Sequence, residues 1–227
     1  FTLVLNAEPA SNVVLRVTSA DTTEVTVGTA DYTFTSGNWD SAQTVTLTGI
    51  NDTIVDTDTQ TTVTITVVDA SSDNNFDDVA DQTVTVTTTD NETAGYTKSE
   101  TTQTVTEAGG TDTFTLVLNA EPTSNVVLNV VSADTGEVTV GTADYTFTSG
   151  NWDTPQTVTL TGANDDVIDV DTQTTVSISV TDGSSDDNFD SLSNQTVTVT
   201  TTDNLSQINI KSSRPNSFSK SRSTPKH

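Results

Sequence analysis

Aspartates are concentrated in a loop that follows an alternating Thr/Val stretch in the second half of the chain. Four of them lie close together: Asp165, Asp166, Asp169 and Asp171. Carboxylates this close repel one another unless a cation lies among them. Oxygen ligands in a flexible arrangement suit Ca²⁺ better than Zn²⁺ or copper, and the chain has no cysteine to supply a thiolate ligand. The chemistry that this stretch predicts is therefore the binding of Ca²⁺.

The acidic loop belongs to a unit that occurs twice. Residues 1–91 match residues 114–204 at about 70 of 91 positions, with a constant offset of 113 residues, which indicates a duplication. Residues 92–113 have no counterpart in the first repeat, the chain begins at Phe1, and it contains no Met. We expect the chain to be a fragment of a longer array, cut inside a repeat.

Three segments follow from this repeat. Residues 1–91 form a domain that lacks its first strand, and residues 94–204 form a complete one. In residues 205–227 Ser, Pro, Lys and Arg replace the alternating pattern, and no apolar period remains. We predict that this basic tail is disordered, because it has no apolar face with which to offset the entropy of ordering.

The elements that must position the acidic loops are β-strands. Thr and Val dominate and alternate with period two, and strong helix formers are scarce. Short strands separated by turn signals predict an all-β fold of tandem immunoglobulin-like, seven-stranded β-sandwiches. In the second repeat we expect strands at 103–106, 113–119, 125–132, 144–148, 156–162, 173–181 and 195–202, with a short extended piece at 137–141.

The alternating direction of strands in a sandwich gathers the acidic loops at one end. In the second repeat this end collects seven carboxylates, from Glu107, Asp134, Glu137, Asp165, Asp166, Asp169 and Asp171. A hairpin between 137–141 and 144–148 would add one reversal of strand direction. The loops that follow it would then lie at the other end, and the cluster would not form. In the first repeat the corresponding acids are Asp21, Glu24, Asp52, Asp56 and Asp58.

The last strand of each repeat ends at this acidic end, and the next repeat begins at its opposite end. The acids of the first repeat therefore face loops of the second, including the acidic loop 182–194. Ca²⁺ bound at such a junction would stiffen an array of repeats. The neighbouring repeat is thus an expected partner alongside the ion.

The order of motifs resembles that of Calx-β domains, which occur in the regulatory region of sodium–calcium exchangers and in large bacterial surface proteins. The motifs are Thr-Val-Thr-Glu-Ala-Gly-Gly at 104–110, Ser-Ala-Asp at 132–134 and Gly-Ala-Asn-Asp-Asp at 162–166. The resemblance covers residues 1–204. It implies a seven-stranded immunoglobulin-like sandwich and, in calcium-binding members, ligation by Glu107, Asp134, Asp165 and Asp166.

Composition excludes several classes of function. The formal net charge is −25, and Arg16 and Lys98 are the only basic residues before the tail, so the repeats repel nucleic acid and anionic membranes. No run of apolar residues is long enough to insert into a membrane. The sole histidine is His227 and there is no cysteine, which excludes Ser–His and Cys–His catalysis within the repeats. We expect a protein that is not an enzyme, located outside the cell or on its surface.

Three hypotheses on function remain open. The first is a calcium-stiffened extender of a surface or adhesion protein, and the second is an acidic spacer that needs no calcium. The third is an adhesin module that binds a surface glycan or protein through Trp152 and the loop 182–194. Alternatively, Trp152 and Phe189 fill the open end of the sandwich.

Overall fold

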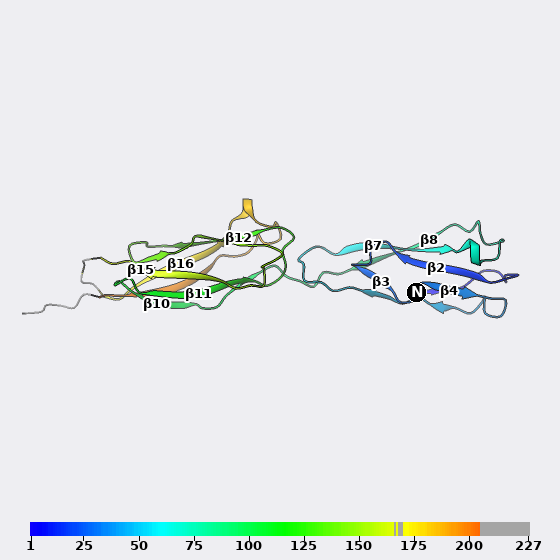
Figure 1. The fold of residues 1–227 in the computed structure, drawn as a ribbon, viewed down its shortest axis with the longest axis horizontal. Coiled ribbons are helices and arrows are strands. Elements are labelled where there is room, and N and C mark those ends of the chain that lie inside the picture. Colours follow the sequence, from blue (N-terminus) through cyan, green and yellow to red (C-terminus); the bar gives the residue numbers. More distant parts are fainter. Residues whose placement is uncertain (166, 168–169, 205–227) are drawn as a thin grey trace, which may run out of the picture.

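The chain folds into two β-sandwich domains that lie end to end (Figure 1). A computed structural model describes residues 1–165, 167 and 170–204. Within these residues the helices are two single 3-10 turns, η1 (Asp69–Ser71) and η2 (Asp182–Ser184). No helix in the described part of the chain could span a membrane. The predicted all-β fold class is confirmed.

Domain 2 is a sandwich of two sheets. The first sheet has the order β10 (Thr102–Thr106), β17 (Gln195–Thr202), β16 (Thr172–Val180), β12 (Val126–Ser132) and β14 (Asp144–Phe147). The second has the order β13 (Val138–Val140), β15 (Gln156–Gly162), β11 (Thr111–Leu118) and β9 (Tyr96–Lys98). Across both sheets of domain 2 the strand pairs are antiparallel, except that β10 and β17 are parallel.

Alternation along the strands builds the core between the two sheets. In β11, Phe114, Leu116 and Leu118 are buried, while Thr115 and Val117 between them are half-buried. They pack in one cluster with residues of the opposite sheet, such as Leu128 and Val176. One face of each sheet is therefore dry and the other meets solvent, as the period-two pattern predicts.

The segments β13 and β14 form a strand that changes sheets, and they do not pair as a hairpin. β13 pairs with β15 in one sheet, and β14 pairs with β12 in the other. The alternation of strand direction therefore continues through this region. The acidic loops that were expected at one end of the sandwich remain at that end.

Domain 1 repeats this architecture with fewer strands. They are β1 (Thr2–Leu3), β2 (Val13–Ser19), β3 (Val25–Val27), β4 (Asp31–Phe34), β5 (Gln43–Thr44), β6 (Leu47–Gly49), β7 (Thr59–Val67) and β8 (Gln82–Thr88). The register is preserved: Val13 pairs with Phe34 as Val126 pairs with Phe147. The sequence of domain 1 contains no counterpart of β9 and β10, so β8 is an edge strand.

The two domains meet through the loop between β6 and β7 of domain 1. The backbone N–H of Val55 donates to the carbonyl oxygen of Glu121 at 2.9 Å, and the N–H of Glu121 donates to the carbonyl oxygen of Thr53 at 2.7 Å. The Asn188 side chain donates to the carbonyl oxygen of Val55 at 2.9 Å. Val55 is only 6% exposed and belongs to the hydrophobic core cluster of domain 2. A residue of one domain thus completes the core of the next.

Candidate metal site

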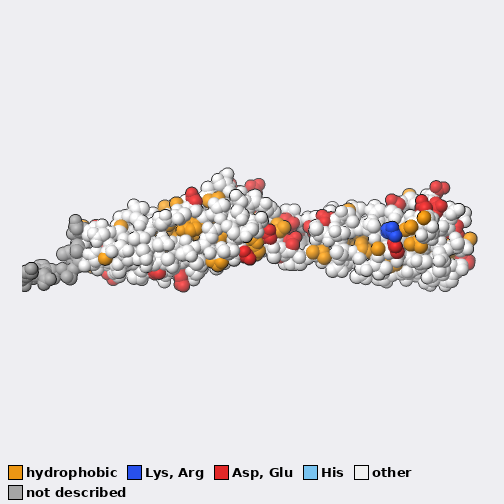
Figure 2. Space-filling model, in the orientation of Figure 1, with side chains coloured by type: hydrophobic (Ala, Val, Ile, Leu, Met, Phe, Trp, Pro, Cys, Tyr) orange, Lys and Arg blue, Asp and Glu red, His pale blue; other side chains and the backbone are white. Residues whose placement is uncertain are grey.

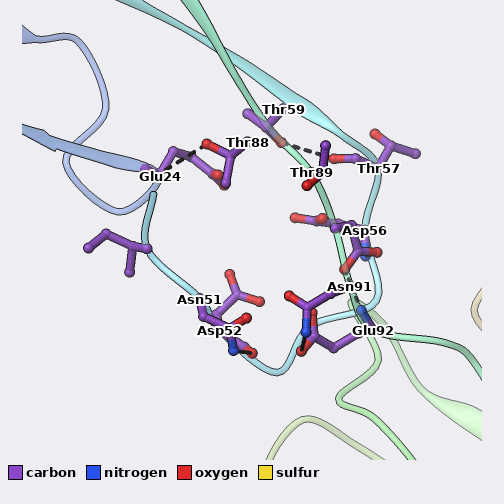
Figure 3. Close-up of a pocket in the computed structure, with 12 residues that line it drawn as sticks. Glu24, Asn51, Asp52, Asp56, Thr57, Thr59, Thr88, Thr89, Asn91 and Glu92 are labelled. Carbon is purple, nitrogen blue, oxygen red and sulfur yellow. Dashed lines mark hydrogen bonds between the residues drawn. The ribbon is translucent and has the colours of Figure 1, made fainter. Parts of the chain in front are cut away.

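Three carboxylates converge in a recess at the end of domain 1 that faces domain 2 (Figure 3). They belong to Glu24, Asp52 and Asp56, and one oxygen from each lies within 4.8 Å of the others. The three come from two separate loops, one before β3 and one between β6 and β7. All three residues belong to the set that the sequence predicts as metal ligands.

Backbone hydrogen bonds hold these loops together. The carbonyl oxygen of Glu24 accepts from the N–H of Ile50 at 2.8 Å, which fastens the loop before β3 to the end of β6. A carboxylate oxygen of Asp52 accepts from the N–H of Ile54 at 2.9 Å. The side chain of Asp52 therefore shapes the loop that also carries Val55 into domain 2.

A second group of acids lies beside the recess and was not predicted as part of the site. Asp90 and Glu92 line the recess just after β8. The carboxylate of Asp90 accepts from the N–H groups of Asp56 at 3.2 Å and of Glu92 at 2.9 Å, and its own N–H donates to Asp58 at 3.1 Å. The sequence signal is the Asp-Asn-Glu run that follows the last strand, which must end at the acidic end of the sandwich.

Partial desolvation and the crowding of negative charge make some of these carboxyl groups harder to ionise. The pKa of Asp56 is raised from its ordinary value by partial desolvation and by the charges of Asp90, Asp52 and Asp58. The pKa of Glu92 is also raised, first by desolvation and then by Asp90. Repulsion that raises a carboxyl pKa is repulsion that a bound cation relieves.

The recess has the size and the donors for a single hard cation. Its volume is about 20 Å³, comparable to the roughly 10–15 Å³ that one water needs. Ca²⁺ takes oxygen ligands at about 2.3–2.6 Å, so two ligands on opposite sides of the ion stand roughly 5 Å apart. The three carboxylate oxygens lie within 4.8 Å of one another, so they are close enough to bind the same ion. Carboxylates in a recess of this size suit Ca²⁺ and leave no room for an organic ligand.

The raised pKa values predict how the stability of the metal-free protein depends on pH. A group whose pKa is higher in the folded state contributes stability that is present below its unfolded pKa and is lost as the pH rises through the folded pKa. Acidification from neutral pH toward the ordinary carboxyl pKa of about 4 should therefore raise the unfolding temperature of domain 1 in metal-free buffer, through Asp56 and Glu92. Thermal unfolding at several pH values measures this.

The opposite trend comes from groups with lowered pKa values, and it begins at lower pH. Hydrogen bonds from Thr23 lower the pKa of Asp21, and backbone N–H groups lower that of Asp73. Their stabilisation is lost as the pH falls from the ordinary Asp value through their lowered folded pKa. Asp56→Asn should remove part of the gain on mild acidification, and an unchanged gain in that variant would show that other groups cause it.

Two predicted ligands, one in each domain, accept hydrogen bonds within their own turns. The one in domain 1 does not line the recess. Asp21 accepts hydrogen bonds from the N–H and the hydroxyl of Thr23, at 2.9 and 2.6 Å. Its counterpart Asp134 accepts from the N–H of Gly136 at 2.9 Å. Aspartate commonly caps a turn in this way, two residues ahead of the donor. Both are exposed at the acidic end of their own domain.

Domain 2 places its predicted ligands at the equivalent end. Glu107 is only 2% exposed, and its N–H donates to the carbonyl oxygen of Thr202 at 3.2 Å. The carbonyl oxygen of Glu137 accepts from Ala163 at 2.8 Å, which joins the loop before β13 to the end of β15. Asp165 is half-buried and Asp171 is exposed. Asp166 and Asp169 lie outside the described residues.

The loop aromatics pack against the core of domain 2. Phe189 is fully buried, and Trp152 is partly buried against the same cluster. The carbonyl oxygen of Trp152 also accepts from the N–H of Leu118 at 3.1 Å. This arrangement agrees with the interpretation that the two rings fill the end of the sandwich.

Acidic side chains lie on both sides of the narrow region between the domains (Figure 2). Among the described residues an ion pair joins Arg16 to Asp31 at 2.7 Å, away from the recess. Its partners are about half exposed, at 48% and 45%, so it adds little to stability. Among the described residues, therefore, no lysine or arginine forms an ion pair with the acidic side chains at the junction.

Comparison with known proteins assigns no family. No family profile and no curated protein matches the chain. Among solved structures, domains 4 and 5 of the S-layer protein SbsC share 18% identity and a TM-score of 0.40, over 83% of this chain and 70% of that one. The E. coli chaperone DraB shares 7% identity and a TM-score of 0.36, over 50% of this chain and 57% of that one. Likenesses this loose carry no argument about function.

Proposed function

We propose that the chain is a pair of Calx-β-like modules in a non-enzymatic repeat protein outside the cell, and that Ca²⁺ at the junction stiffens the pair. The observation that supports this most is the recess formed by Glu24, Asp52 and Asp56. Asp52 and Asp56 lie in the same loop as Val55, which enters the core of domain 2. One short loop therefore carries two of the three carboxylates and the contact with the next domain.

Different residues of this region would bind the ion and contact domain 2. Asp52 and Asp56 would hold the ion from either side of the segment 53–55, with Glu24 as the third carboxylate. Neutralising their repulsion would fix the loop in the conformation that presents Thr53 and Val55 to Glu121. The ion supplies positive charge and oxygen coordination. The hydrogen bonds across the junction then hold the two domains in one orientation.

The far end of domain 2 supports an array in which this contact is repeated. Val167 is the counterpart of Ile54, which forms the bridge to Glu121. It is 57% exposed. An exposed valine beside an acidic loop is a suitable contact for a further repeat of the same kind.

The absence of catalytic side chains supports a role without chemistry. Residues 1–204 contain no His and no Cys. The carboxylates of the recess surround a space of about 20 Å³, which is too small for a substrate such as a sugar. The packing of Trp152 against the core also leaves less of the ring for stacking on a glycan.

Calorimetric titration of the whole chain with Ca²⁺ tests the proposal. We expect saturable binding that Asp52→Asn/Asp56→Asn weakens at least about tenfold, while Asp40→Asn/Asp81→Asn leaves it unchanged. The control removes the same charge from exposed loops away from the recess. Absence of binding heat, or equal loss in both double variants, would leave the acidic spacer as the better account.

Relaxation measurements by NMR test the mechanical part of the proposal separately. In Ca²⁺ the two domains should tumble as one elongated body. In chelator they should reorient more independently, because repulsion loosens the loop that carries Val55. Binding without any change in tumbling would show that the ion does not stiffen the junction.

A further inference from the structure

The far end of domain 2, which faces away from domain 1, carries exposed valines and acids together (Figure 1). Val167 and Val170, in the loop between β15 and β16, are 57% and 80% exposed. Asp165 and Asp171 lie in the same loop, and Asp203 directly follows β17. This surface therefore presents apolar contact area and negative charge side by side.

The equivalent loop of domain 1 is covered by the next domain. Val55 is only 6% exposed, within the core cluster of domain 2, and its N–H donates to the carbonyl oxygen of Glu121 at 2.9 Å. Single exposed valines are common on protein surfaces. This loop differs from such cases, because its copy in domain 1 is buried by the domain beside it. A segment of suitable chemistry that adjoins the far end of domain 2 could cover the valines there in the same way.

The sequence that directly follows domain 2 has the complementary chemistry. The basic tail, residues 205–227, lies outside the described residues and contains no Asp or Glu. Its apolar residues nearest to domain 2 are Leu205, Ile208 and Ile210. Its basic residues follow them, and they are Lys211, Arg214, Lys220, Arg222 and Lys226. A segment that is first apolar and then basic suits a surface that presents valines beside carboxylates.

The basic residues of the two repeats lie away from this surface. Residues 1–204 contain only two, Arg16 and Lys98. Arg16 pairs with Asp31 in domain 1. Lys98 lies on β9, which pairs with the end of β11 that leads to the junction with domain 1. The positive charges closest along the chain to the far end of domain 2 are therefore those of the basic tail.

The attachment of the basic tail favours contact within the chain. The Asn204 side chain, just before the tail, donates to the side-chain oxygen of Asn164 at 2.6 Å. Thr172 opens β16, which pairs with β17, and its hydroxyl donates to the carbonyl oxygen of Val170 at 3.1 Å. Both sides of the valine loop are thus held close to the start of the tail. Ile208 can lie up to about 14 Å from Asn204, and so short a tether gives an effective concentration on the order of millimolar.

We propose that residues 205–214 of the basic tail dock on the far end of domain 2. The apolar residues of the segment cover Val167 and Val170. Lys211 and Arg214 lie against the neighbouring carboxylates and reduce their mutual repulsion. A segment that is disordered by itself can order on a surface that supplies apolar contact and opposite charge. The inference does not rest on calcium binding at the junction, because the junction is at the opposite end of domain 2.

Paramagnetic relaxation enhancement in the whole chain, with chelator present, tests where the segment lies. The chain has no cysteine, so Ser217→Cys provides a single position for a spin label. The label should broaden the amide signals of Val170 and Asp203 and leave those of 69–78, at the distant end of domain 1, unchanged. Equal broadening over both domains, or none at Val170 and Asp203, would overturn the proposal.

A mixture of two preparations separates contact within the chain from contact between copies. One preparation is labelled with ¹⁵N and carries no spin label, and the other carries the spin label without ¹⁵N. We expect no broadening in the mixture. Broadening of Val170 and Asp203 there would overturn the proposal, because the occupant would be the tail of a second copy.

Two matched double variants test the contribution of charge. Lys211→Gln/Arg214→Gln removes the two basic residues nearest to domain 2, and Lys220→Gln/Arg222→Gln removes two others from the same tail. The first variant should lower the ratio of docked to undocked chains by about three- to tenfold, and the second by less than about twofold. Equal effects would indicate general attraction between tail and repeats, and would contradict docking of 205–214.

A matched pair of valine variants tests the apolar contact. Val170→Ser changes the proposed docking surface, whereas Val79→Ser changes a loop of domain 1. Both valines are exposed, at 80% and 49%, so neither substitution disrupts a core. Only Val170→Ser should weaken docking, by about threefold or more. Unchanged docking in that variant, measured by the same relaxation enhancement, would rule out the placement of the segment over the valines.

Discussion

Saturating Ca²⁺ should raise the unfolding temperature of domain 1 by roughly 10–20 °C. Filling one site at about 100 times its dissociation constant adds roughly 2.7 kcal/mol, and in a domain of about 90 residues each kcal/mol shifts the midpoint by about 4–8 °C. That gain is a large part of the ~5–15 kcal/mol that holds a whole domain folded. Differential scanning calorimetry of the whole chain, with and without Ca²⁺, measures the shift.

Variants of the recess distinguish a specific site from general screening of charge. Asp52→Asn/Asp56→Asn should abolish the calcium response. It should also raise the unfolding temperature in chelator, because both the desolvation of the Asp56 carboxylate and its repulsion by neighbouring acids, which together raise its pKa, are relieved. Mg²⁺ should give a much smaller shift, because it keeps its waters and requires a tighter octahedron. Equal shifts with both ions, retained in the double variant, would contradict a specific calcium site.

Gly162→Ala should destabilise domain 2 by about 3 kcal/mol or more. A Cβ at Gly162 would come within 2.1 Å of the carbonyl oxygen of Thr106 and 2.7 Å of its carbonyl carbon. Both atoms belong to the backbone, so no side-chain rotation relieves the clash. The change must separate β15 from β10 or shift both strands. Chemical denaturation, followed by the fluorescence of the two Trp residues, measures the loss.

The repeat supplies a matched control for this substitution. Gly49 is the counterpart of Gly162 in domain 1, where no β10 lies beside it, and a Cβ there meets only the Thr88 side chain at 3.6 Å. Gly49→Ala should be neutral or stabilise by up to about 1 kcal/mol, because alanine restricts the unfolded chain. Similar destabilisation by both substitutions would mean that the approach of Thr106 is not the cause.

Most of the fold could be predicted from the sequence because its signal is local. Period-two alternation predicted strands such as β15 and β17. β9 was not predicted, since three residues, Tyr96–Lys98, are too few to show a period. The change of sheet between β13 and β14 was also undetermined, because pairing partners depend on the whole sandwich.

The candidate site was predicted in part. Glu24, Asp52 and Asp56 come together as the strand directions require. Asp21 does not join them, because a hydrogen bond to Thr23, two residues away, is available without any tertiary contact. The docking of Val55 could not be predicted, since an isolated valine in an acidic loop has no pattern that indicates what covers it.

The parallel pairing of β10 with β17 determines how domain 2 bears mechanical load. One strand lies near the start of the domain and the other at its end, and both run in the same direction. Tension along the chain pulls them in opposite directions, so the hydrogen bonds of all five residue pairs are loaded in shear at the same time and do not open one by one. β8 has no such partner in domain 1. Under stretching force domain 1 of this chain should therefore yield before domain 2.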